Sequence, residues 1–217
     1  MSSILEKALS ILELMADHPE GMQVSAIAEQ VEQPVSGVHR QLREFERLHY
    51  VRQLQSQGAY TLTIKLAALG LGFLGRSGVT DIAQPILDRL AKTSKELIRL
   101  SVLDENRLVW VAVAQGATSG LRYDPGREQG VVVHLASSAG GLAFLSALSD
   151  EEALTWVTKQ GLRPTEFEPG SKAPKTIAEL QKLLKETRKR GYSIAVDSYM
   201  EGMAAMAVPV RDPETGA

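Results

Sequence analysis

The sequence predicts an α+β protein in two parts, and three observations support this fold class. Over the first sixty of its 217 residues, hydrophobic residues recur at helical spacing and then give way to a short pair of strand-like segments. Beyond residue 78, strand patterns joined by a hairpin turn alternate with helical patterns. The content of 44% hydrophobic and 23% charged residues is that of a globular protein, with room for one large domain or two small ones.

Composition excludes several classes of site. The absence of cysteine excludes a disulfide framework, a Cys-ligated zinc site, an iron–sulfur cluster and a thiol nucleophile, and it fits a reducing compartment. The net charge is −2, and no apolar run has the roughly 18 residues that span a membrane. Acidic residues interrupt the first apolar stretch, so it does not resemble a signal peptide. We therefore expect a soluble, cytoplasmic protein that binds neither membrane, metal nor cofactor.

The first helix is expected to begin after Ser3, because Ser3 and Glu6 have the spacing of a capping box. Residues 18–21, with the sequence His-Pro-Glu-Gly, should end this helix. Its apolar stripe consists of Ile4, Ala8, Ile11, Leu12 and Met15.

A second, shorter helix over residues 24–31 should stop before Pro34, because the residue before a proline is disfavoured in helical conformation. A third helical stripe contains Val35, Val38, Leu42, Phe45 and Leu48. Strand patterns at 50–54 and 59–62 then predict a hairpin. Helix, short helix, tight turn, helix and hairpin are the elements of a winged helix-turn-helix, which we place at residues 1–63.

The third helix and the hairpin form the candidate DNA-binding surface. In this motif the start of the helix enters the major groove, and arginines further along meet phosphates. The candidate residues are Val35, Ser36, Gly37, His39, Arg40 and Arg43 on the helix and Arg52 on the hairpin. Residues 1–60 hold five basic and eight acidic residues, a net charge of −3, which opposes phosphate binding. Four of those five basic residues lie within residues 40–52, so the pattern leaves both DNA binding and an ordinary solvated face open.

An apolar linker helix is expected over residues 64–78. Gly70, Gly72 and Gly75 formally match a dinucleotide-binding fingerprint, but no strand precedes them and no βαβ unit follows. We therefore favour glycines that permit close helix packing over a cofactor loop. The second domain is expected to span residues 79–217.

That second domain should be a mixed α/β unit with antiparallel strands. A helix over 79–93 contains Pro85, which predicts a late start or a kink. Ser149 with Glu152, and Thr176 with Glu179, have capping-box spacing, and the helices that follow should end at Gly161 and Gly191. A further helix is expected at 139–148, and strands are expected at 97–103, 108–114, 121–123, 131–135, 192–196 and 204–210. Basic residues gather at 182–190, where they favour helix-dipole compensation over a second nucleic-acid patch.

Several motifs, in order, resemble those of the IclR family of bacterial transcription regulators, over nearly the whole chain. Residues 34–42, Pro-Val-Ser-Gly-Val-His-Arg-Gln-Leu, are similar to the family's recognition helix, and Tyr60-Thr61-Leu62 is similar to the end of its wing. In the second domain, residues 121–122 and 136–141 resemble "L-R … A-T-A-x-G-K-A". Residues 190–193 and 201–210 resemble "R-G-Y … G-x-x-A-I-A-A-P-V".

The resemblance implies a homodimer or a dimer of dimers that binds an operator in double-stranded DNA. It also implies a GAF-like C-terminal domain that binds a small organic acid or an aromatic metabolite. The candidate effector-binding residues are Ser137, Ser138, Ala139, Gly140, Ala195 and Ala205. An alternative is that the two serines only cap a helix. The family continues beyond the turn at residues 213–217, so we expect that either the C-terminus is truncated or the effector pocket is incomplete.

Departures from the family pattern bear on the effector. Small-acid binders in the family carry an acidic residue and a cysteine at the positions of Ala195 and Ala205, and the lysine of the family's "G-K-A" motif is replaced by Gly141. A site lined by two alanines is roomier and less polar, which favours an aromatic or medium-sized apolar acid.

Two other classes of function compete with a regulator. An enzyme could draw on Ser137, Ser138, His134 and Asp197, but the chain lacks the common hydrolase, metalloprotease and nucleotide-binding motifs. The four histidines, His18, His39, His49 and His134, show no metal-ligand spacing. The helix-turn-helix could instead bind protein, which salt-dependent binding to duplex DNA would distinguish.

Overall fold

A computed structural model describes residues 3–55, 58–118 and 130–211. The chain divides into two compact units, Met1–Val79 and Thr80–Ala217, which are described separately. Every helix in the described ranges is too short or too polar to cross a membrane.

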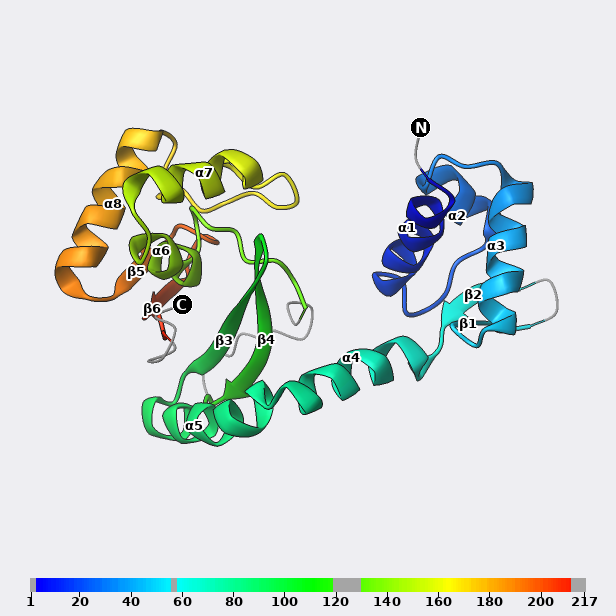
Figure 1. The fold of residues 1–217 in the computed structure, drawn as a ribbon, viewed down its shortest axis with the longest axis horizontal. Helices are drawn as coiled ribbons and strands as arrows, with labels where there is room; N and C mark the ends of the chain where they lie inside the picture. The colour runs from blue at the N-terminus through cyan, green and yellow to red at the C-terminus, as the bar shows by residue number, and fades with distance from the viewer. Residues whose placement is uncertain (1–2, 56–57, 119–129, 212–217) are drawn as a thin grey trace. The chain divides into compact units, whose positions relative to one another are not determined.

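The first unit is a winged helix-turn-helix (Figure 1). Its elements are α1 (Ile4–Ala16), α2 (Val24–Gln30), α3 (Val35–Arg47), β1 (Val51–Gln53), β2 (Tyr60–Leu62) and α4 (Ile64–Ser77). The expected capping box is present, with Ser3 and Glu6 each accepting a hydrogen bond from the other's backbone N–H. The strands β1 and β2 pair antiparallel, with Arg52 opposite Thr61. One apolar core joins the three helices and the hairpin through residues such as Ile11, Met15, Ile27, Val38, Leu42 and Tyr60.

The linker helix α4 confirms the helix expected after the hairpin. Thr63 caps its first turn by accepting from Lys65 N–H, and Gly78 ends it in the left-handed conformation. All fourteen residues of α4 are described, and none is buried. The glycines of the dinucleotide-type motif lie inside this helix, so they form no cofactor loop. A Cβ added to Gly70 or Gly75 would meet no atom of a neighbouring element within 4 Å, so the expected close packing has no partner among the described residues.

The second unit confirms the mixed α/β prediction. Its elements are α5 (Val79–Ser94), β3 (Leu97–Asp104), β4 (Arg107–Gln115), α6 (Ala139–Ser146), α7 (Asp150–Gln160), α8 (Ile177–Arg190), β5 (Ser193–Val196) and β6 (Ala204–Ala207). Among the described residues, β3 pairs with β4 and β5 with β6, both antiparallel. The helix α6 contacts α8, β5 and β6, and the main core forms around it (Figure 1).

Some expected elements differ from the structure. Pro85 lies inside α5, which begins at Val79 rather than late. Residues 131–135 do not form a strand: Val132 makes one isolated bridge with Val109, and a turn begins at Leu135 because the backbone there folds into the cap of α6. The strand expected at 204–210 ends at Ala207, two residues before Pro209. The strand expected at 121–123 and the turn at 213–217 lie outside the described residues.

The capping at α7 and α8 also differs in detail. At α7, Ser149 and Glu152 form the complete box, and Gly161 follows the helix. At α8, Thr176 accepts from Glu179 N–H, but the Glu179 carboxylate accepts from Lys175 N–H instead of the Thr176 backbone. Gly191 then ends α8 in the left-handed conformation, as expected.

Candidate nucleic-acid interface and effector region

The helix α3 has an apolar face and a basic face. Val38 and Leu42 are fully buried and hold the helix on α2 and the hairpin. The opposite stripe contains Ser36, Arg40, Arg43 and Arg47, which share one side of a helix and are all exposed. Of the other predicted residues, Val35, His39 and Arg52 are exposed and Gly37 is half-buried. The structure therefore places a solvent-facing row of arginines on the element predicted to read DNA.

Ion pairs distinguish the arginines of this row. Arg47 bonds Glu44 at 2.6 Å, which lowers the pKa of the Glu44 carboxyl, and Arg43 lies 3.3 Å from Glu46. Arg40 forms no ion pair within the described part of the chain. Arg40 can therefore meet a phosphate or a base edge without first breaking a salt bridge.

The predicted effector residues meet where α6 begins. Ser138 is the N-cap of α6, since its Oγ accepts from Gly141 N–H at 3.0 Å and donates to the His134 carbonyl at 2.7 Å. Ser137 Oγ lies 2.8 Å from His134 Nδ1. Both serines are almost fully buried, and Ser138 caps α6, whereas Ser137 does not. Gly140 is half-buried, and a Cβ on it would lie 3.6 Å from Ser101 Oγ of β3.

The two alanines of the predicted site lie on the neighbouring hairpin. Ala195 of β5 is directly opposite Ala205 of β6, and opposite residues in an antiparallel pair point to the same side. Ser193, on the same face as Ala195, donates from Oγ to the Ala139 carbonyl at 2.7 Å and so joins β5 to the start of α6. Ala195 is buried, whereas Ala205 is exposed.

An aromatic cluster beside this region was not predicted. The His134 ring packs edge-on against Phe167 at 6.1 Å, Phe167 packs on Tyr199 at 4.8 Å, and Tyr199 packs on Trp110 at 5.7 Å. The Arg99 guanidinium lies 4.7 Å from the Trp110 ring centroid. These residues come from four separate parts of the sequence, so no local motif could have identified them.

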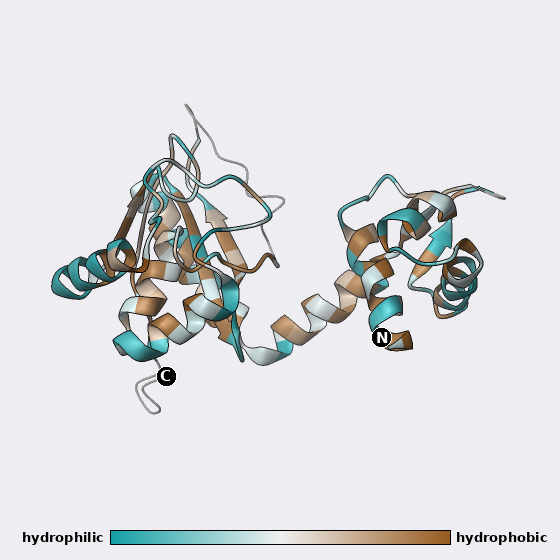
Figure 2. Ribbon diagram, turned by 90° about the horizontal axis from the view of Figure 1, so that it is seen from above, coloured by the Kyte–Doolittle hydropathy of each residue, from teal (hydrophilic) through white to brown (hydrophobic). Residues whose placement is uncertain are grey.

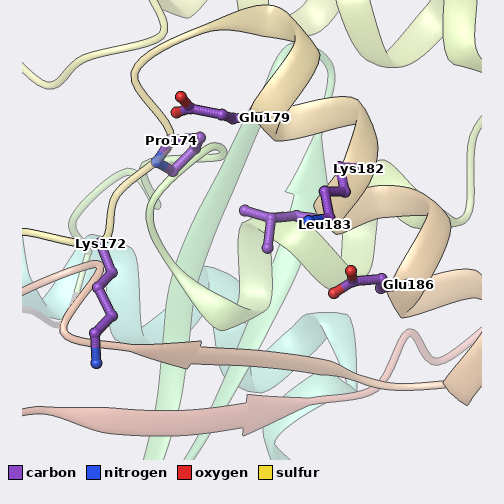
Figure 3. Close-up of a pocket in the computed structure, with 6 residues that line it drawn as sticks. All are labelled: Lys172, Pro174, Glu179, Lys182, Leu183 and Glu186. Atoms are coloured by element: carbon purple, nitrogen blue, oxygen red, sulfur yellow. The ribbon is translucent and has the colours of Figure 1, made fainter.

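A surface depression of about 270 Å³ lies elsewhere, between the start of α8 and the loop before it (Figure 3). It is lined by Lys172, Pro174, Glu179, Lys182, Leu183 and Glu186, none of which is a predicted effector residue. Two lysines and two glutamates around a small apolar floor do not suit an apolar ligand, because ligand pockets are mostly apolar. Lys172 is also already bonded to Asp197 at 2.9 Å.

The burial of His134 predicts that acid destabilises the second unit. Ser137 N–H donates to His134 Nδ1 at 3.3 Å, so Nδ1 is an acceptor and the ring is neutral in the fold. Burial lowers the pKa of the His134 imidazole, opposed by the Gly161 backbone. The unfolded chain therefore binds a proton more readily, and the stability that His134 contributes is complete above its ordinary pKa of about 6.5.

We therefore expect the free energy of unfolding to fall between pH 7.5 and pH 5, and to fall less in His134→Gln. Urea unfolding of both proteins at several pH values, followed by tryptophan fluorescence, measures this difference. An equal pH dependence of the free energy of unfolding in the two proteins would show that His134 does not cause the loss of stability in acid.

Comparison with known proteins decides the family. Residues 4–55 match the IclR helix-turn-helix domain, and residues 72–216 match the bacterial transcriptional regulator IclR C-terminal domain. The chain belongs to the IclR family. Its helix-turn-helix and its effector-binding domain are those of a transcriptional regulator rather than an enzyme. The buried Ser137–His134 pair is part of the turn before α6.

Relatives within the IclR family span most of the chain. It is 28% identical to the acetate operon repressor of Salmonella typhimurium strain LT2, covering 96% of this chain and 74% of that protein. It is also 28% identical to the regulator KdgR of Escherichia coli K12, over 98% of this chain and 77% of that protein. The crystal structure of the Thermotoga maritima IclR has a TM-score of 0.70 at 26% identity, and the match covers 97% of this chain and 82% of that one. The structure of an IclR homologue from Microbacterium hydrocarbonoxydans, complexed with 4-hydroxybenzoate, has a TM-score of 0.76 at 21% identity. The match covers 97% of this chain and 84% of that one.

Proposed function

We propose that this chain acts in the cytoplasm as a homodimeric repressor whose operator binding is modulated by a small organic acid. In this proposal residues 1–63 bind DNA, residues 64–78 connect, and residues 79–217 bind the effector. The observation that supports it best is the exposed arginine stripe of α3, opposite a fully buried apolar face. We propose repression rather than activation because relatives such as the acetate operon repressor are repressors.

Salt-dependent binding to duplex DNA tests the DNA-binding part of this proposal. If Arg40, Arg43 and Arg52 of two copies each neutralise one phosphate, the logarithm of the association constant should fall against the logarithm of salt with a slope of about −5. Fluorescence anisotropy with a labelled duplex between 50 and 200 mM salt measures this slope. A module that binds only protein would give no saturable binding at any salt concentration.

The exposed face of α4 supports a dimer. Leu69 and Phe73 lie four residues apart on one side of the helix and are 52% and 69% exposed, Leu71 on the other side is 68% exposed, and the helix is mostly brown to white in Figure 2. A second copy that covers these side chains would remove a large apolar patch from water.

We expect the double variant Leu69→Glu/Phe73→Glu to raise the dimer dissociation constant at least tenfold, because each side chain contributes about 1.5 kcal/mol or more when buried. Sedimentation velocity over a micromolar concentration series measures the constant. Leu103→Glu, which adds a charge at an exposed apolar residue of β3, is the control and should leave it unchanged. A wild-type protein that sediments as a monomer would contradict the proposal.

The effector is proposed to be an aromatic or medium-sized apolar acid. Ala195 and Ala205 offer a ligand no polar group, and Ser137 and Ser138 already bond within the turn before α6. About 60 Å² of additional apolar contact would contribute roughly 1.5 kcal/mol, a tenfold preference for the larger acid.

We expect calorimetry to show heat on titration with at least one hydroxybenzoate, and at least tenfold weaker binding of glyoxylate and pyruvate. Ala195→Asp should reduce binding of the hydroxybenzoate, because it puts a negative charge beside the acid. Tight glyoxylate binding with no response to any aromatic acid would contradict this assignment of the effector class.

A further inference from the structure

Hydrogen bonds join the end of the helix α3 directly to the first turn of α4. Thr63 N–H donates to the Tyr50 carbonyl at 2.9 Å, and Thr63 Oγ1 donates to the His49 carbonyl at 2.6 Å. Lys65 Nζ donates to the Leu48 carbonyl at 2.8 Å. These three consecutive carbonyls begin at Leu48, the C-cap of α3.

Lys65 makes the contact of this junction that involves a charge. Its ammonium satisfies one of the carbonyls that the end of α3 leaves without an intrahelical partner, where the helix dipole favours a cation. The same ammonium lies 4.5 Å from the centroid of the Tyr50 ring. Tyr50 packs edge-on against Phe45 of α3 at 6.5 Å, so Lys65 contacts the end of α3 through backbone and side chain at once.

Beyond this turn, α4 has little that fixes its direction. Leu66 packs on the core of the first unit, but Ala67–Leu71 are exposed. His49, in the middle of the junction, has a φ of 62°, a left-handed conformation that a non-glycine residue adopts only where its surroundings hold it. The angle between α3 and α4 therefore depends on the contacts of Thr63, Lys65 and Leu66.

We propose that Lys65 is a specificity-determining residue that sets the spacing between the two DNA half-sites by fixing the angle of α4 to α3. This rests on the proposed function: if two copies associate through α4, the angle at this junction sets the separation of their α3 helices. Base preference within one half-site depends on the exposed face of α3 and should not depend on Lys65. Half-site sequence and half-site spacing are thus controlled by different residues.

Selection from a pool of random duplexes, followed by sequencing, tests this with the full chain. The wild type should enrich two half-sites at one spacing. Lys65→Met, which keeps the apolar stem but removes the ammonium, should enrich the same half-sites with an about tenfold weaker preference for that spacing over neighbouring spacings. Thr63→Val, which removes the hydroxyl bond to His49, should show the same change. Arg163→Met removes one positive charge from the second unit, away from α3 and α4, and should retain the wild-type spacing.

The outcomes separate this inference from the function on which it rests. A single unaltered spacing in folded Lys65→Met and Thr63→Val, as judged by circular dichroism, would overturn the role of the junction and leave DNA binding intact. Enrichment of isolated half-sites by the wild type would do the same. If the wild type enriches no sequence, both the proposed function and the inference fail.

Discussion

Gly141→Ala should unfold or severely destabilise the second unit, whereas Gly140→Ala should leave it folded. A Cβ on Gly141 would lie closer than 3.0 Å to the Leu135 Cα, carbonyl carbon and carbonyl oxygen. These are backbone atoms of a fully buried segment, so they cannot rotate away as a side chain can. We expect a loss of about 3 kcal/mol or more in the free energy of unfolding, at the upper end of overpacking effects.

The adjacent glycine is the matched control. A Cβ on Gly140 meets nothing closer than 3.6 Å, and alanine is favoured over glycine in a helix, so Gly140→Ala should be neutral or stabilising by up to about 1 kcal/mol. Both tryptophans, Trp110 and Trp156, lie in the second unit, so urea unfolding followed by their fluorescence reports on this unit. Equal midpoints for the two variants would show that α6 does not pack against Leu135 as described.

Arg40→Ala should weaken DNA binding by about 1–3 kcal/mol, a loss of roughly fivefold to 150-fold. Arg40 is exposed on the basic stripe of α3 and, in the described part of the chain, has no acidic partner that already satisfies its guanidinium. Arg43→Ala should have a smaller effect, because Arg43 must leave Glu46 to reach the DNA. Gel-shift titration at one fixed salt concentration measures both.

Arg163→Ala provides the charge control. Arg163 lies in the second unit beside Glu168, so its removal lowers the net charge by the same amount without touching α3. An affinity of Arg40→Ala equal to that of Arg163→Ala would mean that α3 does not face the DNA.

The features that could be predicted from the sequence are those set by neighbouring residues. The caps at Ser3 and Ser149 depend on a partner three residues away, and the buried stripe of α3 depends on helical spacing alone. The strand predicted at residues 131–135 was wrong, although the bonds that prevent it are local as well. A β-branched run there favours a strand, but His134 and Ser138 bond within the turn and fold the backbone into the cap of α6.

Contacts between segments that are far apart in the sequence could not be predicted from local patterns. The aromatic cluster joins Trp110, His134, Phe167 and Tyr199, and nothing in the sequence near any one of them indicates the others. Gly141 could be recognised as a departure from the family motif, but the reason that only glycine fits is the backbone of Leu135. For the candidate effector residues, the sequence could not indicate the burial of both serine hydroxyls.

The helix α4 can act as a lever because its fixed contacts lie in its first turn. Its fourteen residues, at a rise of about 1.5 Å each, make a rod roughly 20 Å long. A tilt of about 10° at the Lys65 end would displace the far end by roughly 3.5 Å, close to the rise of about 3.4 Å between base pairs along one DNA strand. In the proposed dimer, an angular change too small to disturb the core of the first unit would therefore be enough to shift the two α3 helices out of register with a DNA site by one base pair.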